Sequence, residues 1–141
     1  MCYELKGKRV LLVEDNEMNR QITKEILEAY GIDVYEAEDG EIAVKMVKNA
    51  KRKPYDFILM DIMMPNMDGY EATIAIRALE NKKLANIPII AMTAAITQGD
   101  KLKALESGMN AHLSKPVDIP ELLSTIKNVM TSFQNGEYLS Y

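Results

Sequence analysis

The chain has 141 residues, of which 48% are hydrophobic and 27% are charged, and its formal net charge at pH 7 is −4. This length and balance are typical of one globular domain with its own core, and the acidic net charge argues against nucleic acid or an anionic membrane surface as the main partner. One cysteine excludes an internal disulfide and no apolar run approaches the length of a membrane span, so we expect a cytoplasmic location.

Strand and helix signals alternate along the chain. Short apolar or alternating runs bounded by turn residues predict strands, and apolar residues that repeat every three or four positions predict helices. In chain order, the predicted elements are a strand at 9–14, a helix at 17–30, a strand at 32–37, a helix from 39 to 50, a strand at 56–60, a helix at 69–80, a polar connector at 81–86, a strand at 88–92, a helix at 99–107, a strand at 111–114 and a helix from 118 to 133.

Two helices carry the clearest signals. The last helix has Asp118 as its predicted cap and Glu121 in the position that completes a capping box. The helix at 17–30 is followed by Gly31, a residue that commonly ends helices. Its apolar residues are spaced to face one hydrophobic core. They are Met18, Ile22, Ile26, Leu27 and Tyr30.

The alternation of five strands with helices predicts an α/β fold. Short connections between strand and helix favour a parallel sheet that helices cover on both faces. We expect a doubly wound (βα)5 domain with the strand order 2-1-3-4-5. The domain takes in residues 1–141, with a core over about 8–133 and a frayed tail over 134–141.

Charged and hydroxyl side chains follow four of the predicted strands. Glu14 and Asp15 end the first, Asp61 the third and Thr93 the fourth, and Lys115 follows the fifth. Because the carboxyl ends of parallel strands meet at one edge, these side chains converge there. Two like charges about 4 Å apart repel by about 4 kcal/mol at an effective dielectric constant of about 20. Three carboxylates therefore predict either a held proton or a bound cation. For a cation, oxygen ligands without a nearby His or Cys favour Mg²⁺.

Each of these residues alone has a simpler explanation. An aspartate at a strand end is commonly a turn former or a helix cap, and the Glu14–Asp15 pair could cap the helix that starts near Glu17. Convergence on one sheet edge favours the functional interpretation. Carboxylates, a hydroxyl and an ammonium suit phosphoryl transfer, with a carboxylate as the covalent acceptor.

Four stretches of the sequence resemble the signatures of a known family. LLVEDNEMNR, ILMDIMMPNMDG, IIAMTA and LSKP are similar to those of response-regulator receiver domains, whose fold is flavodoxin-like. The resemblance covers about residues 8–133 and is closest to the receivers of hybrid sensor histidine kinases. It implies that Asp61 is the phosphoacceptor, that Thr93 and Lys115 each contact a phosphoryl oxygen, and that the peptide bond from Lys115 to Pro116 is cis.

The resemblance also implies a metal site and partners. Asp15, Asp61 and the main-chain carbonyl of Met63 would bind Mg²⁺, with Glu14 acting through a bound water. The phosphoryl donor would be a histidine kinase or a histidine phosphotransfer domain. A homodimer through the helix at 99–107, the strand at 111–114 and the last helix is a further expectation, without direct contact to nucleic acid or membrane.

We do not expect the isolated domain to be an enzyme, beyond catalysing its own aspartyl phosphorylation. A small Mg²⁺-dependent phosphatase with an aspartyl nucleophile is the alternative on the same fold. Such enzymes often carry a second Asp two residues after the first, where this chain has Met63. A pseudo-receiver that binds partners without being phosphorylated is a further alternative, against which the intact acidic residues argue.

The chain departs from the commonest receiver pattern at four positions. His112 occupies the position that is usually Tyr or Phe, and Val117 one where Phe is frequent. Met63 and Ala95 flank the expected path of the hydrolytic water, and neither side chain can orient it. His112 has two interpretations, a partly exposed strand residue without a switching role or a polar, pH-sensitive switch partner. Either one calls the usual coupling of threonine to an aromatic residue into question. Met63 and Ala95 predict a long-lived phosphorylated form.

Overall fold

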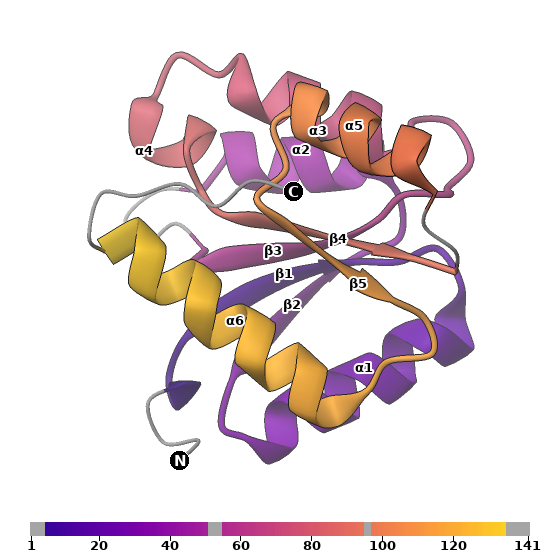
Figure 1. Cartoon of the computed structure of the whole chain (residues 1–141). Coiled ribbons are helices and arrows are strands. Elements are labelled where there is room, and N and C mark those ends of the chain that lie inside the picture. The colour runs from indigo at the N-terminus through magenta and orange to yellow at the C-terminus, as the bar shows by residue number, and fades with distance from the viewer. Residues whose placement is uncertain (1–4, 51–54, 95–96, 135–141) are drawn as a thin grey trace.

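The computed structural model describes residues 5–50, 55–94 and 97–134 (Figure 1). The strands are β1 Arg9–Val13, β2 Asp33–Ala37, β3 Phe57–Asp61, β4 Ile89–Thr93 and β5 Ala111–Ser114. The helices are α1 Glu17–Ala29, α2 Gly40–Lys48, α3 Gly69–Arg77, α4 Lys82–Ala85, α5 Gln98–Ser107 and α6 Ile119–Gln134. All five predicted strands are present, each within a residue or two of its expected bounds. The expected tail beyond residue 134 lies outside the described part of the chain.

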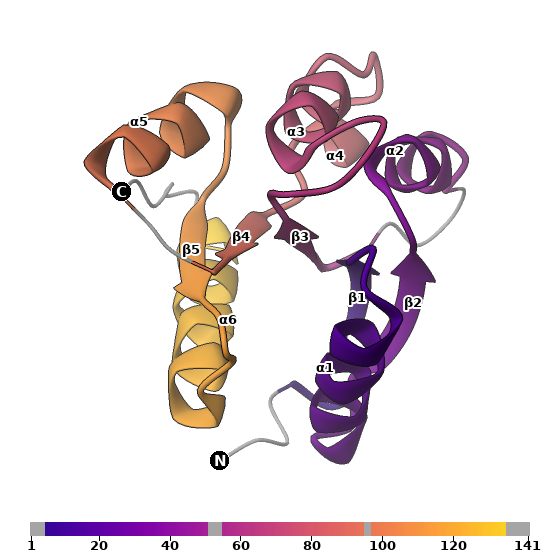
Figure 2. The same ribbon diagram turned by 90° about the vertical axis from the view of Figure 1, so that its right-hand side faces the viewer.

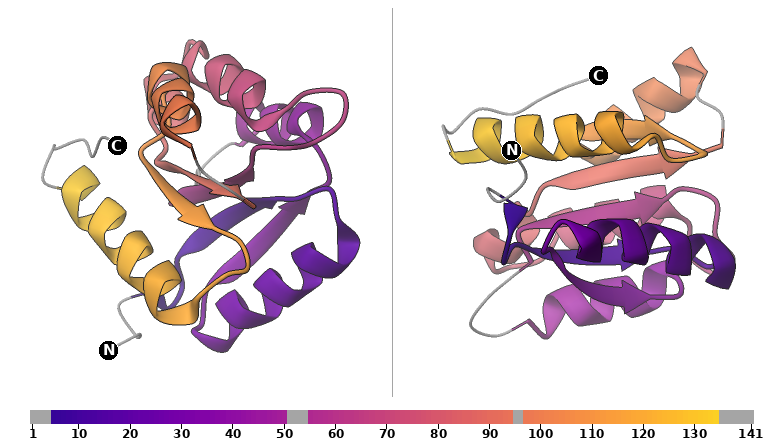
Figure 3. Two further views of the ribbon diagram at one scale, coloured as in Figure 1. Left: turned by 45° about the vertical axis from the view of Figure 1, so that its right-hand side comes forward. Right: turned by 90° about the horizontal axis from the view of Figure 1, so that it is seen from below.

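The five strands form one parallel sheet in the order β2-β1-β3-β4-β5, as predicted. Helices α1 and α6 cover one face, and α2, α3, α4 and α5 lie on the other (Figures 1 and 2). The strands run in the same direction, so that their carboxyl ends share one edge (Figure 3, right). The predicted doubly wound α/β fold is confirmed.

Burial follows position in the sheet. Every residue of β3 and of β4 is buried, because both faces of these strands are covered, and this explains their unbroken apolar sequences. Strand β2 lies at the edge of the sheet, and most of its residues are exposed or half-buried. The buried apolar side chains form two clusters, one on each face of the sheet, where the sequence had suggested a single core.

Helix α1 differs from its predicted packing. Its fully buried residues are Thr23 and Leu27, whereas Met18 is 73% exposed and Ile22 is 49% exposed. The expectation that these two apolar residues face the core is wrong. The start of the helix extends past the strand ends (Figure 3, right), so its first turns have no sheet beneath them. Two apolar side chains are therefore left in solvent at the carboxyl edge of the sheet.

Helix α4 lies within the segment predicted as a polar connector. The side chain of Asn81 caps it by accepting a hydrogen bond from the main-chain N–H of Lys83 at 3.0 Å. Leu84 and Ala85 are buried beneath the turn. The mostly polar composition of this segment gave no sign of a helix, and the short helix is stabilised by burial of these two apolar residues.

Polar side chains cap the helix starts, as the sequence indicated for the last helix. Asp39 caps α2 and Asp68 forms a full capping box with Glu71 at the start of α3. At α6, the N–H of Glu121 donates to the Asp118 carboxylate at 3.1 Å, which is half of the capping box predicted there. Among the described residues, no helix is both long enough and apolar enough to cross a membrane.

Candidate functional site

The structure brings the predicted site residues to one edge of the sheet. Asp61 is the last residue of β3 and Thr93 the last of β4, while Glu14 and Lys115 directly follow β1 and β5. Glu14, Asp15 and Asp61 each place a carboxylate oxygen within 4.8 Å of the others. Glu14, Asp61 and Thr93 are buried, and Asp15 is exposed. The convergence expected from the sequence is confirmed.

A glycine fixes the end of β3. The main-chain N–H of Gly69, the first residue of α3, donates to the carbonyl of Ile62 at 2.9 Å. A Cβ on Gly69 would lie 2.4 Å from the carbonyl oxygen of Asp61, which is closer than any real contact. Only glycine allows α3 to begin against the end of β3. The backbone that carries the Asp61 carboxylate is therefore held by direct packing.

Glu14 is held at its backbone and at its side chain. Its N–H donates to the carbonyl of Ala37 at 3.1 Å, which extends the pairing of β1 with β2 by one bond. Its carboxylate accepts from the N–H of Asn16 at 3.2 Å, and its carbonyl accepts from Nη1 of Arg20 at 2.9 Å. Asn16 is the residue that caps α1. The alternative that Glu14 and Asp15 serve as the helix cap is therefore wrong.

Lys115 brings a positive charge to the acidic residues. Its Nζ lies 2.5 Å from a carboxylate oxygen of Glu14 and 3.2 Å from one of Asp61. Its main-chain N–H donates to the carbonyl of Thr93 at 2.8 Å, which ties the β5–α6 connection to the end of β4. The peptide bond from Lys115 to Pro116 is cis, as expected. One ammonium thus bridges two of the three carboxylates.

One ammonium does not balance the cluster. Burial and the neighbouring Glu14 side chain raise the pKa of Asp61 to about 7, although Lys115 acts in the opposite direction. For Lys115, burial favours the neutral amine, but the hydrogen bond to Glu14 and the charge of Asp61 outweigh burial and raise its pKa. The Asp61 carboxylate therefore has an unmet demand for positive charge. A divalent cation among these oxygens would meet that demand.

The remaining predicted residues lie around this cluster. Met63 is 75% exposed, two residues beyond the end of β3. Ala95 lies outside the described residues. Val117 packs partly buried against the cluster beneath α1 and α6. His112 is half-buried in β5, and burial followed by the charge of Lys101 lowers its pKa, with Glu121 opposing the shift.

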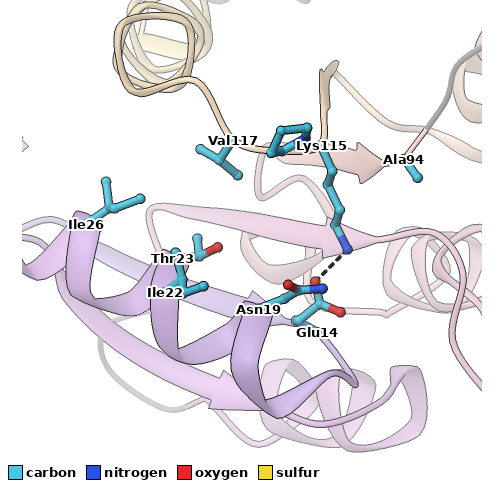
Figure 4. Close-up of a pocket in the computed structure, with 9 residues that line it drawn as sticks. Glu14, Asn19, Ile22, Thr23, Ile26, Ala94, Lys115 and Val117 are labelled. Atoms are coloured by element: carbon cyan, nitrogen blue, oxygen red, sulfur yellow. Dashed lines mark hydrogen bonds and ion pairs between the residues drawn. The ribbon is translucent and has the colours of Figure 1, made fainter.

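A groove of about 450 Å³ opens beside the ion pair. Ile22 and Ile26 of α1 line one wall, and Val117 of the β5–α6 connection lines the other (Figure 4). Lys115 reaches across its end to Glu14. The apolar surface that α1 leaves in solvent is thus continuous with the acidic cluster.

Two residues near the site were not singled out from the sequence. Asn16 and Arg20 hold the segment that carries Glu14 and Asp15. The sequence carries a signal for both residues. Asn16 is a preferred helix-capping residue, and Arg20, four positions later, lies on the same side of the helix. The sequence does not reveal that the Arg20 side chain turns back to the loop.

Comparison with known proteins gives a consistent family. A family model for the response regulator receiver domain matches residues 10–127. The chain is 45% identical over 123 residues to hybrid signal transduction histidine kinase I of Dictyostelium discoideum, which covers 86% of this chain and 7% of that protein. The chain therefore spans less than a tenth of the length of this relative.

Solved structures support the same assignment. The receiver domain of sensor histidine kinase PA1611 from Pseudomonas aeruginosa, crystallised with magnesium in its active-site cleft, is 40% identical with a TM-score of 0.79 over 89% of this chain and 99% of that one. The receiver domain of the histidine kinase CKI1 from Arabidopsis thaliana, complexed with Mg²⁺ and BeF₃⁻, is 31% identical with a TM-score of 0.82 over 93% of this chain and 94% of that one. From the matched family model and the shared fold, this chain belongs to the response-regulator receiver family.

Proposed function

We propose that Asp61 is the phosphoacceptor of this receiver domain and takes its phosphoryl group from a phosphohistidine. The observation that carries the proposal is the state of the Asp61 carboxylate. It is buried at the end of a rigid strand, 3.2 Å from the ammonium of Lys115 and beside two further carboxylates. A fixed nucleophile surrounded by sites for cations is suited to attack an anionic phosphoryl group.

The acidic cluster would hold Mg²⁺. Asp15, Asp61 and the main-chain carbonyl of Met63 supply hard oxygen ligands, and Glu14 would act through a bound water. The raised pKa of Asp61 supports this assignment, because burial and the Glu14 side chain disfavour the charged carboxylate and a bound cation would favour it. The magnesium in the related PA1611 receiver supports it as well. When bound, the ion would neutralise charge on the phosphoryl oxygens.

The transfer needs little more than positioning. One carboxylate oxygen of Asp61 forms a bond to phosphorus while the bond from phosphorus to the donor's imidazole nitrogen breaks. The electron pair of the broken bond returns to the imidazole, which leaves as neutral histidine because the other ring nitrogen of the phosphohistidine carries a proton. The domain would thus promote its own modification with the residues of its own site, and it would need no other nucleophile.

Thr93 and Lys115 would bind the product. The Thr93 hydroxyl can donate to one phosphoryl oxygen, and the Lys115 ammonium can pair with another. Lys115 already lies between Glu14 and Asp61, so it need only exchange one acceptor oxygen for another. This exchange would link phosphorylation of Asp61 to the β5–α6 connection.

The groove beside α1 would receive the donor. Met18 and Ile22 are exposed next to the cluster, and Ile26 and Val117 line the same groove. An amphipathic helix carrying the phosphohistidine, from a histidine kinase or a histidine phosphotransfer domain, would cover these side chains. Such a partner places the reaction in the cytoplasm, where we propose that the domain acts.

A second surface would carry the output. Leu105 on α5 and Ile119 on α6 are exposed. Strand β5, which lies between these two helices in the chain, holds His112. We propose that phosphorylation favours a homodimer through α5, β5 and α6. Lys115 directly follows β5, and its connection leads into α6, so the exchange at Lys115 would act on two of the three elements of this surface.

The acceptor assignment is tested by chemical labelling. Acetyl phosphate with Mg²⁺ should add one phosphoryl group to the protein, measured by intact mass. Asp61→Asn should abolish the addition, because an amide is a poor nucleophile. Asp33→Asn removes an exposed carboxylate from β2 and is the matched control, which should label like the parent.

Persistent labelling of Asp61→Asn would place the acceptor elsewhere. Repeated turnover of an aryl phosphate by the parent would favour the phosphatase alternative, in which the aspartyl phosphate is only an intermediate. A parent that never labels, although it binds a purified histidine phosphotransfer domain, would favour a pseudo-receiver.

A further inference from the structure

Arg20 connects three elements at the edge of the acidic cluster. Its Nη1 donates to the main-chain carbonyl of Glu14 at 2.9 Å, and its Nε lies 3.1 Å from a carboxylate oxygen of Glu36. Arg20 belongs to α1, Glu36 to β2, and Glu14 to the loop that leaves β1. The Arg20 side chain is 13% exposed and its bond to the Glu14 carbonyl is partly buried, whereas the Glu36 side chain is 34% exposed.

The contact to Glu14 is made where the sheet ends. The N–H of Glu14 donates to Ala37, and this is the last bond that extends the pairing of β1 with β2. Beyond it the chain turns toward the Asn16 cap of α1. The carbonyl of Glu14 lies at this turn, and the guanidinium of Arg20 supplies its donor. The Arg20 side chain therefore holds the main chain by a hydrogen bond directly after the last bond between β1 and β2.

Fixing this carbonyl fixes both acids. A peptide unit is planar, so the direction of the Glu14 carbonyl sets the direction of the next N–H and the path of the chain into Asp15. Glu14 is buried with its carboxylate on Lys115, whereas Asp15 is exposed. For Asp15, orientation through the backbone is therefore the main constraint that the described contacts provide.

Arg20 is itself held in place. Glu36 pairs with Arg20 through one carboxylate oxygen and with Lys24 through the other, at 3.1 Å and 3.2 Å. Lys24 lies one helical turn beyond Arg20, so both cations project from the same side of α1 toward Glu36. The rigid, planar guanidinium can donate to a carboxylate and a carbonyl at once in fixed directions, which an ammonium on a flexible stem does less well.

We propose that Arg20, anchored by Glu36, is a positioning residue that orients the Glu14–Asp15 peptide and thereby sets the affinity of the acidic cluster for Mg²⁺. The proposal rests on the metal site assigned under the proposed function. It gives Arg20 no contact with the phosphoryl group and no part in the transfer itself.

The charge of Arg20 and its proposed positioning role predict opposite changes in Mg²⁺ affinity when the residue is replaced. Arg20 is a cation near an anionic site, so removing its charge alone should tighten the binding of Mg²⁺. Loss of orientation should weaken it, because partners that orient metal ligands typically contribute about 10–100-fold in affinity. The sign of the change therefore separates the two roles.

The experiment compares three variants of the full chain by Mg²⁺ titration, followed by amide chemical shifts. Arg20→Gln removes both the positive charge and the guanidinium group. Arg20→Lys keeps the positive charge but loses the planar set of N–H donors. Both should bind Mg²⁺ about tenfold more weakly than the parent. Lys24→Gln is the matched control, since it removes a charge that pairs with the same Glu36 and leaves the Glu14 carbonyl bond in place. Its affinity should stay within about twofold of the parent, or rise.

A second measurement separates positioning from general instability. The rate of labelling by acetyl phosphate should recover in Arg20→Lys when Mg²⁺ is saturating, because only the occupancy of the site is reduced. Equal or tighter Mg²⁺ binding by both Arg20 variants overturns the proposal. So does loss of the native amide spectrum in both, since Arg20 would then serve stability. A parent that binds no Mg²⁺ overturns the proposed metal site as well.

Discussion

Asp61 shows how a single residue couples function to stability. The pKa of a free Asp side chain is about 3.9, and burial with the Glu14 side chain raises that of Asp61 to about 7. Between these values the folded protein binds a proton that the unfolded chain has released. Stability from this group is therefore fully present at low pH and is lost as the pH rises toward 7.

This linkage predicts the behaviour of Asp61→Asn without metal. At pH 8 in EDTA the variant should be more stable than the parent by a few kcal/mol, since about 1.4 kcal/mol accompanies each unit of pKa shift. The gap should narrow near pH 5, where the parent carboxyl holds its proton. Urea denaturation at both pH values measures the difference.

Magnesium should make the parent more stable than Asp61→Asn at pH 8, the reverse of the order expected in EDTA. Bound to the parent, Mg²⁺ stabilises the folded state by mass action, and its effect should be larger at pH 8 than at pH 5 because protons compete for Asp61. Asp61→Asn should gain little. A parent that is already more stable than the variant in EDTA at pH 8 would contradict the raised pKa.

Individual residues differ in how far the sequence predicts them. Glu14, Asp61, Thr93 and Lys115 were predictable because each lies at a strand end, and strand ends follow from simple runs of apolar residues. The role of Arg20 was not, because it depends on where a long side chain on a helix reaches in three dimensions. Backbone periodicity places Cα atoms and does not place guanidinium groups.

The junction of β3 and α3 is a feature of two elements rather than of one residue. Gly69→Ala would place a Cβ 2.4 Å from the Asp61 carbonyl oxygen, so α3 or the end of β3 must move. We expect a loss of about 1–3 kcal/mol in stability, measured by urea denaturation, together with slower labelling of the displaced Asp61.

Gly99→Ala is the matched control for this junction. Gly99 lies inside α5, and the nearest atom to an added Cβ there is Thr97 Oγ1 at 3.7 Å. Alanine should leave stability unchanged or raise it by about 0.5–1 kcal/mol, since glycine is the poorer helix former. If both variants behave alike, close approach at Gly69 is not what holds Asp61.

Long side chains also explain the element that the sequence missed. Arg77, at the end of α3, donates from Nη1 to the carbonyls of Ala85 and Ile87, both at 2.7 Å, and from Nε to that of Gly108 at 3.0 Å. These bonds draw α4 and the end of α5 toward α3. A polar connector can therefore form a helical turn there, because a neighbouring cation satisfies the carbonyls that follow it.

At the scale of the whole molecule, two proposed binding surfaces adjoin β5 and the connection that follows it. The groove by α1 and Val117 opens at the acidic cluster, and the surface formed by α5, β5 and α6 includes His112 and Leu105. Burial lowers the pKa of His112, and the charges of Lys101 on α5 and Glu121 on α6 shift this pKa in opposite directions. Since burial and Lys101 lower its pKa, His112 is neutral at pH 7.5 and adds no charge to the surface.

The proposed homodimer through α5, β5 and α6 can be tested on this surface. Leu105 is 39% exposed and lies one helical turn beyond Lys101, whose charge lowers the pKa of His112. Ile42 on α2 is 38% exposed and lies on a helix away from this surface, so it is the matched control.

We expect beryllofluoride with Mg²⁺ to raise the dimer fraction in sedimentation velocity at pH 7.5, because it occupies the place of a phosphoryl group. Leu105→Ser should weaken that dimer about fivefold or more, the equivalent of about 1 kcal/mol of lost apolar contact. Ile42→Ser should dimerise like the parent, and both variants should label at the parental rate because neither residue lies near Asp61. Equal weakening by the two substitutions would reflect general loss of stability, and a protein that stays monomeric with beryllofluoride would show that this surface serves a different partner.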